Sequence, residues 1–132
     1  MSILCYNKMK KLKGGIYMGV YITVGIFILF DIATGLLKAL NQKDLNSTIL
    51  RKGLYHKLSE VIAVAGSGLL EYGIQYINLG VDIPVLGVVS VYVCGMELVS
   101  IIENLCEINP TLYKLFKPYL TKLKEKDEDK DV

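Results

Sequence analysis

Histidine and cysteine are scarce in this chain of 132 residues, which has one histidine and three cysteines. The cysteines, Cys5, Cys94 and Cys106, are widely spaced and form no CxxC pair, so neither a zinc site nor a disulfide framework is predicted. We interpret them as inert buried thiols. The sequence therefore predicts no metal and no cofactor.

Basic residues are absent from a long central part of the chain, Leu58–Tyr113, although 15 Lys and Arg occur in all. The apolar stretch Leu58–Leu79 is long enough to cross a bilayer, yet it carries Glu60 and Glu71. A carboxylate at the centre of a membrane helix costs about 2.5–3.5 kcal/mol on insertion scales. Because this stretch holds no cation, we expect its carboxylates to be satisfied by water, another subunit or a bound proton.

The composition is too apolar for a small water-soluble domain, with 52% hydrophobic residues and a mean hydropathy of +0.41. A chain this short cannot bury so much apolar surface in one core. We predict an all-α, small integral membrane protein that is oligomeric, with three transmembrane helices and additional interfacial segments. The expected transmembrane domain covers residues 1–109, with helices at about 15–38, 58–79 and 85–105. An interfacial amphipathic segment at 110–124 and a charged, disordered tail at 125–132 follow it.

The first apolar stretch follows four lysines, as in a signal peptide. However, it is longer than a signal-peptide core, resumes after Asp31, and lacks an A-x-A cleavage site, which favours a retained transmembrane helix. Gly15 and Gly19 have the small-xxx-small spacing that permits close helix approach. In the last segment, Pro110 begins a helix and Pro118 predicts a break or kink in it.

Polar residues align along the second and third helices. At 100° per residue, Glu60, Ser67, Glu71, Gln75 and Asn78 fall within about 80° of one another, as do Ser90, Glu97, Ser100 and Asn104. One alternative is a polar seam inside each monomer, and the other is an oligomeric pore lining or subunit contact. We favour the second, because three helices offer little protein to bury so many acids. The candidate pore-lining or subunit-contact residues are Asp31, Glu60, Ser67, Glu71, Gln75, Ser90, Glu97, Ser100 and Asn104.

The basic residues predict a topology and a lipid contact. The loop 38–57 holds five basic residues and one acid, while the turn Gly80–Pro84 holds no basic residue. The positive-inside rule places the loop and the C-terminus in the cytoplasm and the N-terminus outside. Ser47 is a candidate cap for a short helix within the loop. The residues expected to contact lipid headgroups are Lys38, Arg51, Lys52 and Lys57. Nucleic acid is not an expected partner, because the basic regions flank apolar segments.

Three sequence blocks carry a family resemblance. They are Asp31-x-x-Thr34-Gly35-x-x-Lys38-Ala39, then Asn46-Ser47 with Arg51-Lys52-Gly53-x-x-x-Lys57, and then Glu97-Leu98-Val99-Ser100-Ile101-Ile102-Glu103-Asn104 followed by Pro110. In this order and spacing the chain resembles the toxin-secretion/phage lysis holins, the group that includes the clostridial toxin-release holin. The resemblance implies a multi-pass protein of the bacterial inner membrane that self-associates and opens holes at a set time. Endolysin or a large toxin would be the cargo, and no residue would be catalytic.

Two other functions remain open on the sequence alone. An antiholin or accessory membrane subunit would have the same fold without making a hole of its own. A small ion or proton-coupled transporter would use the membrane carboxylates as a relay. An enzyme is not expected, because these carboxylates lack a neighbouring His, Lys or nucleophile at a spacing typical of a catalytic site. Met9 and Met18 also leave open a shorter start of translation.

Overall fold

The computed structural model describes residues 3–77 and 83–128, and within them the side chains of residues 14–77 and 83–122. The described residues form four helices: α1 (Ile3–Gln42), α2 (Ser47–Ile74), α3 (Val85–Ile108) and α4 (Pro110–Glu128). No strand occurs among these residues. The prediction of an all-α fold is confirmed.

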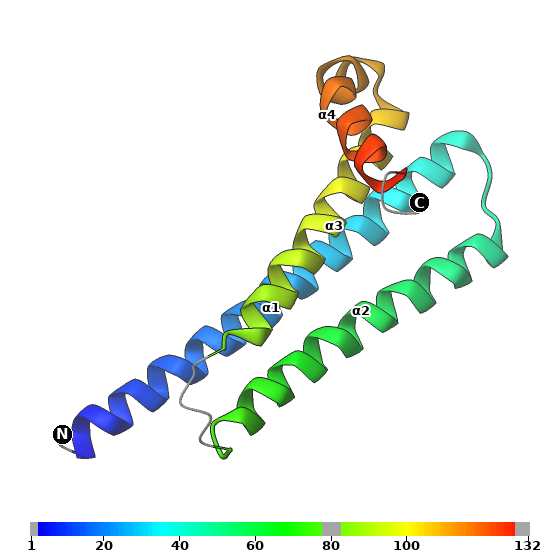
Figure 1. Cartoon of the computed structure of the whole chain (residues 1–132). Helices are drawn as coiled ribbons and strands as arrows, with labels where there is room; N and C mark the ends of the chain where they lie inside the picture. Colours follow the sequence, from blue (N-terminus) through cyan, green and yellow to red (C-terminus); the bar gives the residue numbers. More distant parts are fainter. Residues whose placement is uncertain (1–2, 78–82, 129–132) are drawn as a thin grey trace.

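The helices are arranged around α3, which packs against α1, α2 and α4. Helices α1 and α3 lie side by side along much of their length, and α2 runs back in the direction opposite to α1 (Figure 1). The link between α1 and α2 lies at the same end of the molecule as α4, while the start of α3 lies near the other end (Figure 1). The side of the membrane that each end faces stays a prediction.

Helix α2 begins earlier than the sequence predicted. We expected a short interfacial helix followed by a membrane helix from residue 58, but one continuous helix runs from Ser47 to Ile74. Its cap is Asn46 rather than Ser47, because the Asn46 Oδ1 accepts a hydrogen bond of 2.9 Å from the Thr48 N–H. No proline lies between residues 47 and 74 to stop the helix, so it continues through the basic segment.

The ends of α1 and α4 also differ from expectation. Helix α1 ends at Gln42. The next residue, Lys43, has a left-handed φ of 54°, a conformation that commonly follows the end of a helix. Helix α4 continues past Pro118 to Glu128, so the predicted break is absent. Residues 125–128 of the predicted tail form the end of α4, and disorder of the tail stays a prediction. Residues 129–132, Asn78 and Gly80–Asp82 of the predicted turn lie outside the described residues.

Two of the described helices are long and apolar enough to cross a membrane, Gly14–Gln42 within α1 and Val85–Ile108, the whole of α3. Helix α2 does not meet that test within the described residues, so the prediction of three transmembrane helices is not confirmed. Many large apolar side chains are nevertheless exposed on all three helices, among them Leu29, Leu69 and Val91. Such a surface suits hydrocarbon better than water.

The apolar core is small and lies between α1, α2 and α3. It consists of Val24 and Ile28 from α1, Val64 from α2, and Leu86 and Val93 from α3. On either side of this core along the helix axes, some of the buried or half-buried side chains are charged. The middle of the bundle is therefore apolar, and the charged side chains lie on either side of it along the helices.

Close packing of α2 depends on the absence of a side chain at Gly68. A Cβ built at Gly68 would collide with the Tyr21 hydroxyl of α1 and approach Leu86 Cδ1 to 3.6 Å. Overpacking of this kind costs about 1–3 kcal/mol. We expect Gly68→Ala to lower the thermal midpoint in detergent relative to Gly66→Ala, the matched control, since a Cβ at Gly66 meets no described atom within 4 Å. Equal midpoints for the two variants would contradict the packing of Tyr21 against Gly68.

Candidate functional site: a buried charged cluster

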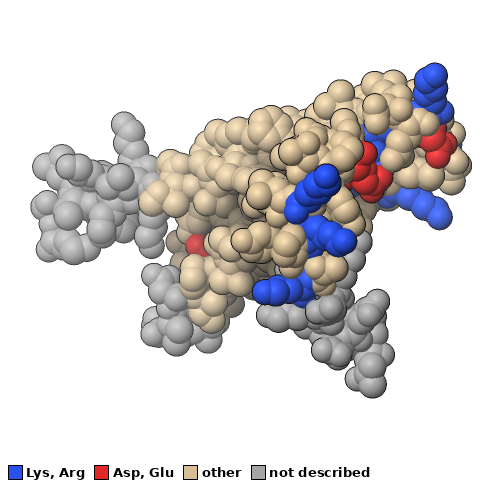
Figure 2. All heavy atoms as spheres, turned by 90° about the horizontal axis from the view of Figure 1, so that it is seen from above, with Lys and Arg blue, Asp and Glu red and all other residues tan. Residues whose placement is uncertain are grey.

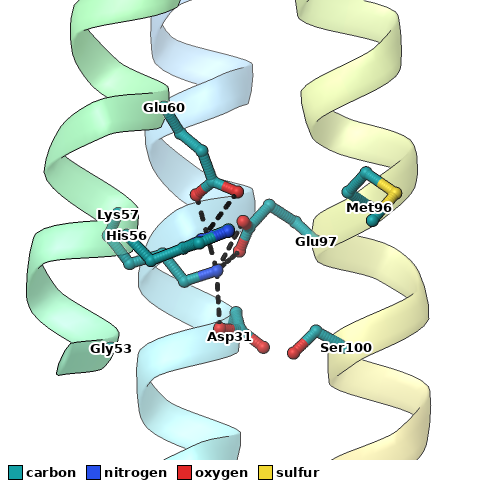
Figure 3. A pocket seen from close by; sticks show the side chains of 8 residues that line it. All are labelled: Asp31, Gly53, His56, Lys57, Glu60, Met96, Glu97 and Ser100. Atoms are coloured by element: carbon teal, nitrogen blue, oxygen red, sulfur yellow. Dashed lines mark hydrogen bonds and ion pairs between the residues drawn. The ribbon is translucent and has the colours of Figure 1, made fainter.

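Four ionisable side chains from three helices meet beside the apolar core. This charged cluster consists of Asp31 from α1, Lys57 and Glu60 from α2, and Glu97 from α3 (Figure 3). The Lys57 Nζ lies 2.8 Å from Asp31 Oδ2 and donates hydrogen bonds of 2.5 and 2.6 Å to the two carboxylate oxygens of Glu97. It also lies 3.5 Å from Glu60 Oε2. One ammonium group therefore joins α1, α2 and α3.

The cluster is withdrawn from solvent. The exposed fraction of the Glu97 side chain is 1%, and those of Asp31, Glu60 and Lys57 are 10%, 13% and 14%. Removing a charge from water costs several kcal/mol, which only close, well-formed pairing offsets. The short distances around Lys57 supply that pairing. A cation missing from such a cluster would leave its carboxylates uncompensated.

The charges in the cluster do not balance. Three carboxylates face one ammonium, so with all four groups ionised the charge is 1 − 3 = −2. His56 Nδ1 lies 3.3 Å from Glu60 Oε1 and adds a positive charge only when protonated; its side chain is 68% exposed. The cluster therefore holds α1, α2 and α3 together by one cation that is shared among mutually repelling acids.

A cavity of about 350 Å³ adjoins these groups and is lined by all four cluster residues together with Gly53, His56, Met96 and Ser100 (Figure 3). A cavity of this size that is lined by charged side chains has room for water molecules. Within the described part of the chain, no group of three or more His, Cys, Asp or Glu is arranged to hold a metal ion. The arrangement is suited to holding or releasing helices through hydration and charge.

The position of Lys57 corrects two expectations. We assigned Lys57 to lipid headgroups, but its amino group is buried among three acids. We also expected no cation for these acids, because residues 58–113 contain no Lys or Arg, and Lys57 immediately precedes that segment. Lys57 and Glu60 are spaced i, i+3, and the unbroken α2 places both on one face, directed at α1 and α3. That spacing is the sequence signal that could have identified the pair.

A second polar contact lies on the other side of the core, at Glu71 of α2. The Tyr17 hydroxyl of α1 donates a hydrogen bond of 2.9 Å to Glu71 Oε1, and the Leu86 N–H at the start of α3 donates one of 2.8 Å to Oε2. Pro84, which precedes α3, provides no side-chain cap. A carboxylate at a helix N-terminus satisfies a free N–H and interacts favourably with the helix dipole. Glu71 thus caps α3 from a neighbouring helix.

A third set of contacts joins α1 to α3 toward α4. The Asn104 amide donates hydrogen bonds of 3.3 Å to Asp31 Oδ1 and 3.4 Å to Thr34 Oγ1. Lys38, the second residue we assigned to headgroups, forms an ion pair of 2.8 Å with Glu107, which also accepts a hydrogen bond from Gln42. These contacts continue the polar face of α1 beyond the charged cluster.

The remaining predicted site residues are placed as follows. The Ser67 hydroxyl donates to the Val64 carbonyl within α2, and the Gln75 amide donates to the Tyr72 carbonyl and is exposed. Ser90 is buried, with no hydrogen-bond partner for its hydroxyl among the described residues. Arg51 and Lys52 are exposed near the start of α2, and their contact with headgroups stays a prediction. Sequence reasoning missed Tyr17 and Glu107, because a pattern along one helix does not indicate which helix lies opposite.

Within one chain the acids of the predicted site belong to an internal polar seam, and their place in a pore lining or subunit contact stays a prediction. Asp31, Glu60, Glu71 and Glu97 all have partners within one chain. The continuous helix α2 supplies Lys57 as the cation, and the start of α3 supplies the Leu86 N–H as a donor to Glu71. Neither partner was predicted from the sequence.

Comparison with known proteins gives one match. A family model described as bacteriophage holin family matches residues 9–125. No curated protein and no solved structure matches the chain significantly. The match spans α2 and α3 completely and includes every residue of the charged cluster.

Proposed function

The chain belongs to the bacteriophage holin family, and from this premise we propose that it self-associates in the bacterial inner membrane and opens holes there. The family match over residues 9–125 is the observation that carries this proposal. In the proposed function, the holes release endolysin or a toxin to the cell wall. The loop between α1 and α2 and the C-terminus face the cytoplasm, as the positive-inside rule favours.

The charged cluster provides a mechanism for holding the hole closed. In the resting chain, the acids that lipid does not tolerate are satisfied by Lys57, and the seam is internal. Separation of α2 from α1 and α3 would expose Asp31, Glu60 and Glu97 together. Polar helix faces in a bilayer are stable only against other polar faces or water. Several copies that open in this way can therefore enclose a water-filled space.

The basic end of the molecule supports the proposed orientation. Exposed basic residues lie in the α1–α2 link, the start of α2 and α4, including Lys43, Arg51, Lys52, Lys114 and Lys117. Figure 2, seen from above, shows several basic side chains with a few acidic ones beside them, while much of the surface drawn in tan carries no charge. Each basic residue near an anionic membrane surface contributes about 1 kcal/mol of attraction.

Release of folded proteins of graded size tests the proposal. Liposomes containing only this chain should release an entrapped folded enzyme as well as a small dye, since a hole passes both. Liposomes prepared with the same mass of heat-inactivated chain serve as the control. Release of small ions alone, with saturation at high concentration, would assign the chain to the transporters and overturn the proposal.

An antiholin or accessory subunit is the second candidate, and one observation favours it. Because the acids are satisfied within a single chain, the chain can remain in the membrane without associating. Expression of this gene alone distinguishes the two candidates. A holin depolarises and kills the cell without help, whereas an antiholin leaves the cell intact and delays killing by a second holin.

A further inference from the structure

An apolar groove lies between α1 and α3 and is separate from the charged cluster. Its volume is about 470 Å³, and its walls include Ile16, Gly19 and Thr23 of α1 and Gly87, Ser90 and Val91 of α3. No residue of α2 and no Asp, Glu, Lys or Arg lines it. The groove therefore lies on a surface that the charged cluster and its contacts leave free.

Ser90 is the one residue lining the groove with a buried side-chain oxygen that has no hydrogen-bond partner among the described residues. Its exposed fraction is 5%. A buried hydroxyl without a partner costs about 1–3 kcal/mol. A lipid acyl chain in the groove would leave that cost in place, because it offers no hydrogen-bonding group. The hydroxyl oxygen is covered by atoms of its own chain, so a polar atom of a protein helix in the groove would remove that cost once the Ser90 side chain rotates toward it.

Gly19, on the α1 side of the groove, and Gly15, one turn before it, have no close neighbour among the described residues. A Cβ built at Gly15 or Gly19 meets no described atom within 4 Å, so packing inside this chain does not require a small residue at either position. Small residues at a membrane helix surface permit the backbone of another helix to approach closely. The α1 surface next to Ser90 thus has the shape that an approaching helix needs.

We propose that this groove, centred on Gly19 and Ser90, is the surface through which two copies of the chain pair in the membrane. The inference deepens the proposed function, on which it rests, by naming the first contact between copies. A two-fold contact brings the same patch together from both sides. The patch is self-complementary, because Thr23 keeps acceptor capacity on its hydroxyl while donating to the Gly19 carbonyl at 2.9 Å, and Ser90 has a free donor.

This assignment separates pairing from opening. Two copies joined at the α1–α3 groove leave α2 and the charged cluster of each copy undisturbed on another surface. Association can then proceed while Asp31, Glu60 and Glu97 remain beside Lys57. Opening requires a later step at α2.

Disulfide cross-linking in membranes tests the pairing surface. In a chain with Cys5, Cys94 and Cys106 changed to alanine, Val91→Cys places a thiol at the groove, where residue 91 is 75% exposed. Leu69→Cys on α2, where residue 69 is 71% exposed, is the matched control. We expect mild oxidation to yield at least five times more cross-linked dimer for Val91→Cys than for Leu69→Cys. Equal yields, or a monomer that retains phospholipid after mild extraction, would overturn the inference.

Substitutions in the groove give a second measurement without introduced cysteines. Ser90→Ala should weaken dimerisation in micelles about threefold, the usual size of one hydrogen bond between membrane helices. Gly19→Leu should weaken it at least tenfold by blocking the close approach. Gly95→Leu on α3 is the control, since Gly95 is exposed, has no described atom within 4 Å of a built Cβ, and does not line the groove. Unchanged dimerisation in both groove variants would contradict the assignment.

Hole formation measured on the same preparations distinguishes the two proposals. Dimers linked at residue 91 in liposomes that release nothing would support the pairing surface and overturn the proposed function. Release of entrapped protein without a groove-specific link would overturn the pairing surface and leave the proposed function intact.

Discussion

Replacing Lys57 by methionine should destabilise the closed arrangement by about 3–5 kcal/mol, the usual cost of removing one partner from a buried ion pair. Lys57 is the cation that Asp31, Glu60 and Glu97 share, so the variant retains three buried carboxylates without it. Under the proposed function, cells expressing the variant should lose membrane potential earlier than wild-type cells at equal membrane levels of the protein. Unfolding in detergent and the time of depolarisation measure the two effects.

Two further variants make that expectation specific to the cluster. Lys52→Met removes the same charge from an exposed position of α2 and should change neither measurement appreciably. Adding Asp31→Asn and Glu97→Gln to Lys57→Met removes the charges left unpaired, and most of the lost stability should return. A wild-type unfolding midpoint for Lys57→Met alone would show that the cation does not hold the helices together.

Glu97→Gln should have the opposite effect and delay opening. Glu97 is the most buried acid of the cluster, with 1% of its side chain exposed, so its ionised form bears the largest desolvation cost. Glutamine keeps the shape and still accepts a hydrogen bond from Lys57, and it reduces the cluster charge from −2 to −1. Lys57 retains Asp31 and Glu60. We expect the closed arrangement to become more stable and depolarisation to occur later than in wild-type cells at equal membrane levels.

A matched substitution outside the cluster controls for the loss of an acid on α3. Glu107 forms its ion pair with Lys38 at the surface, where the side chains are 47% and 30% exposed. Such pairs contribute about 0–1 kcal/mol, so Glu107→Gln should alter opening much less than Glu97→Gln. Earlier opening of Glu97→Gln would mean that its attraction to Lys57 exceeds its desolvation cost, and that the sign assigned here is wrong.

The helical fold and the approximate place of α3 were predictable, because long apolar runs in a short chain leave few alternatives. The start of α2 was not, since its first turns are basic and resemble a membrane-surface segment when read alone. The cap at Asn46 sits one position before the residue that the pattern favoured. Residues at a helix boundary depend on hydrogen bonds that a periodic pattern does not encode.

The partners of the acids could not be predicted from a single-helix pattern. The alignment of Glu60 and Glu71 on one face of α2 was predicted, but their partners were not. Glu60 pairs with His56 and Lys57 of its own helix. The partners of Glu71 come from α1 and α3, since Glu71 binds Tyr17 and caps α3. Acids on one face of α2 therefore belong to two separate sites. The choice between a seam within one chain and a contact between chains requires knowledge of which helices face one another, and that is a property of the tertiary structure.

The short link between α1 and α2 determines how α2 can move. Residues 43–46 span at most about 14 Å when fully extended, so with the helices intact the first turn of α2 remains close to the end of α1. Movement away from α3 is then a pivoting of a rigid lever about that link. Lys57 lies about 15 Å along the lever and Glu71 about 36 Å. The hydrogen bonds of Glu71 are therefore stretched more than twice as far as the Lys57 contacts, and they break first.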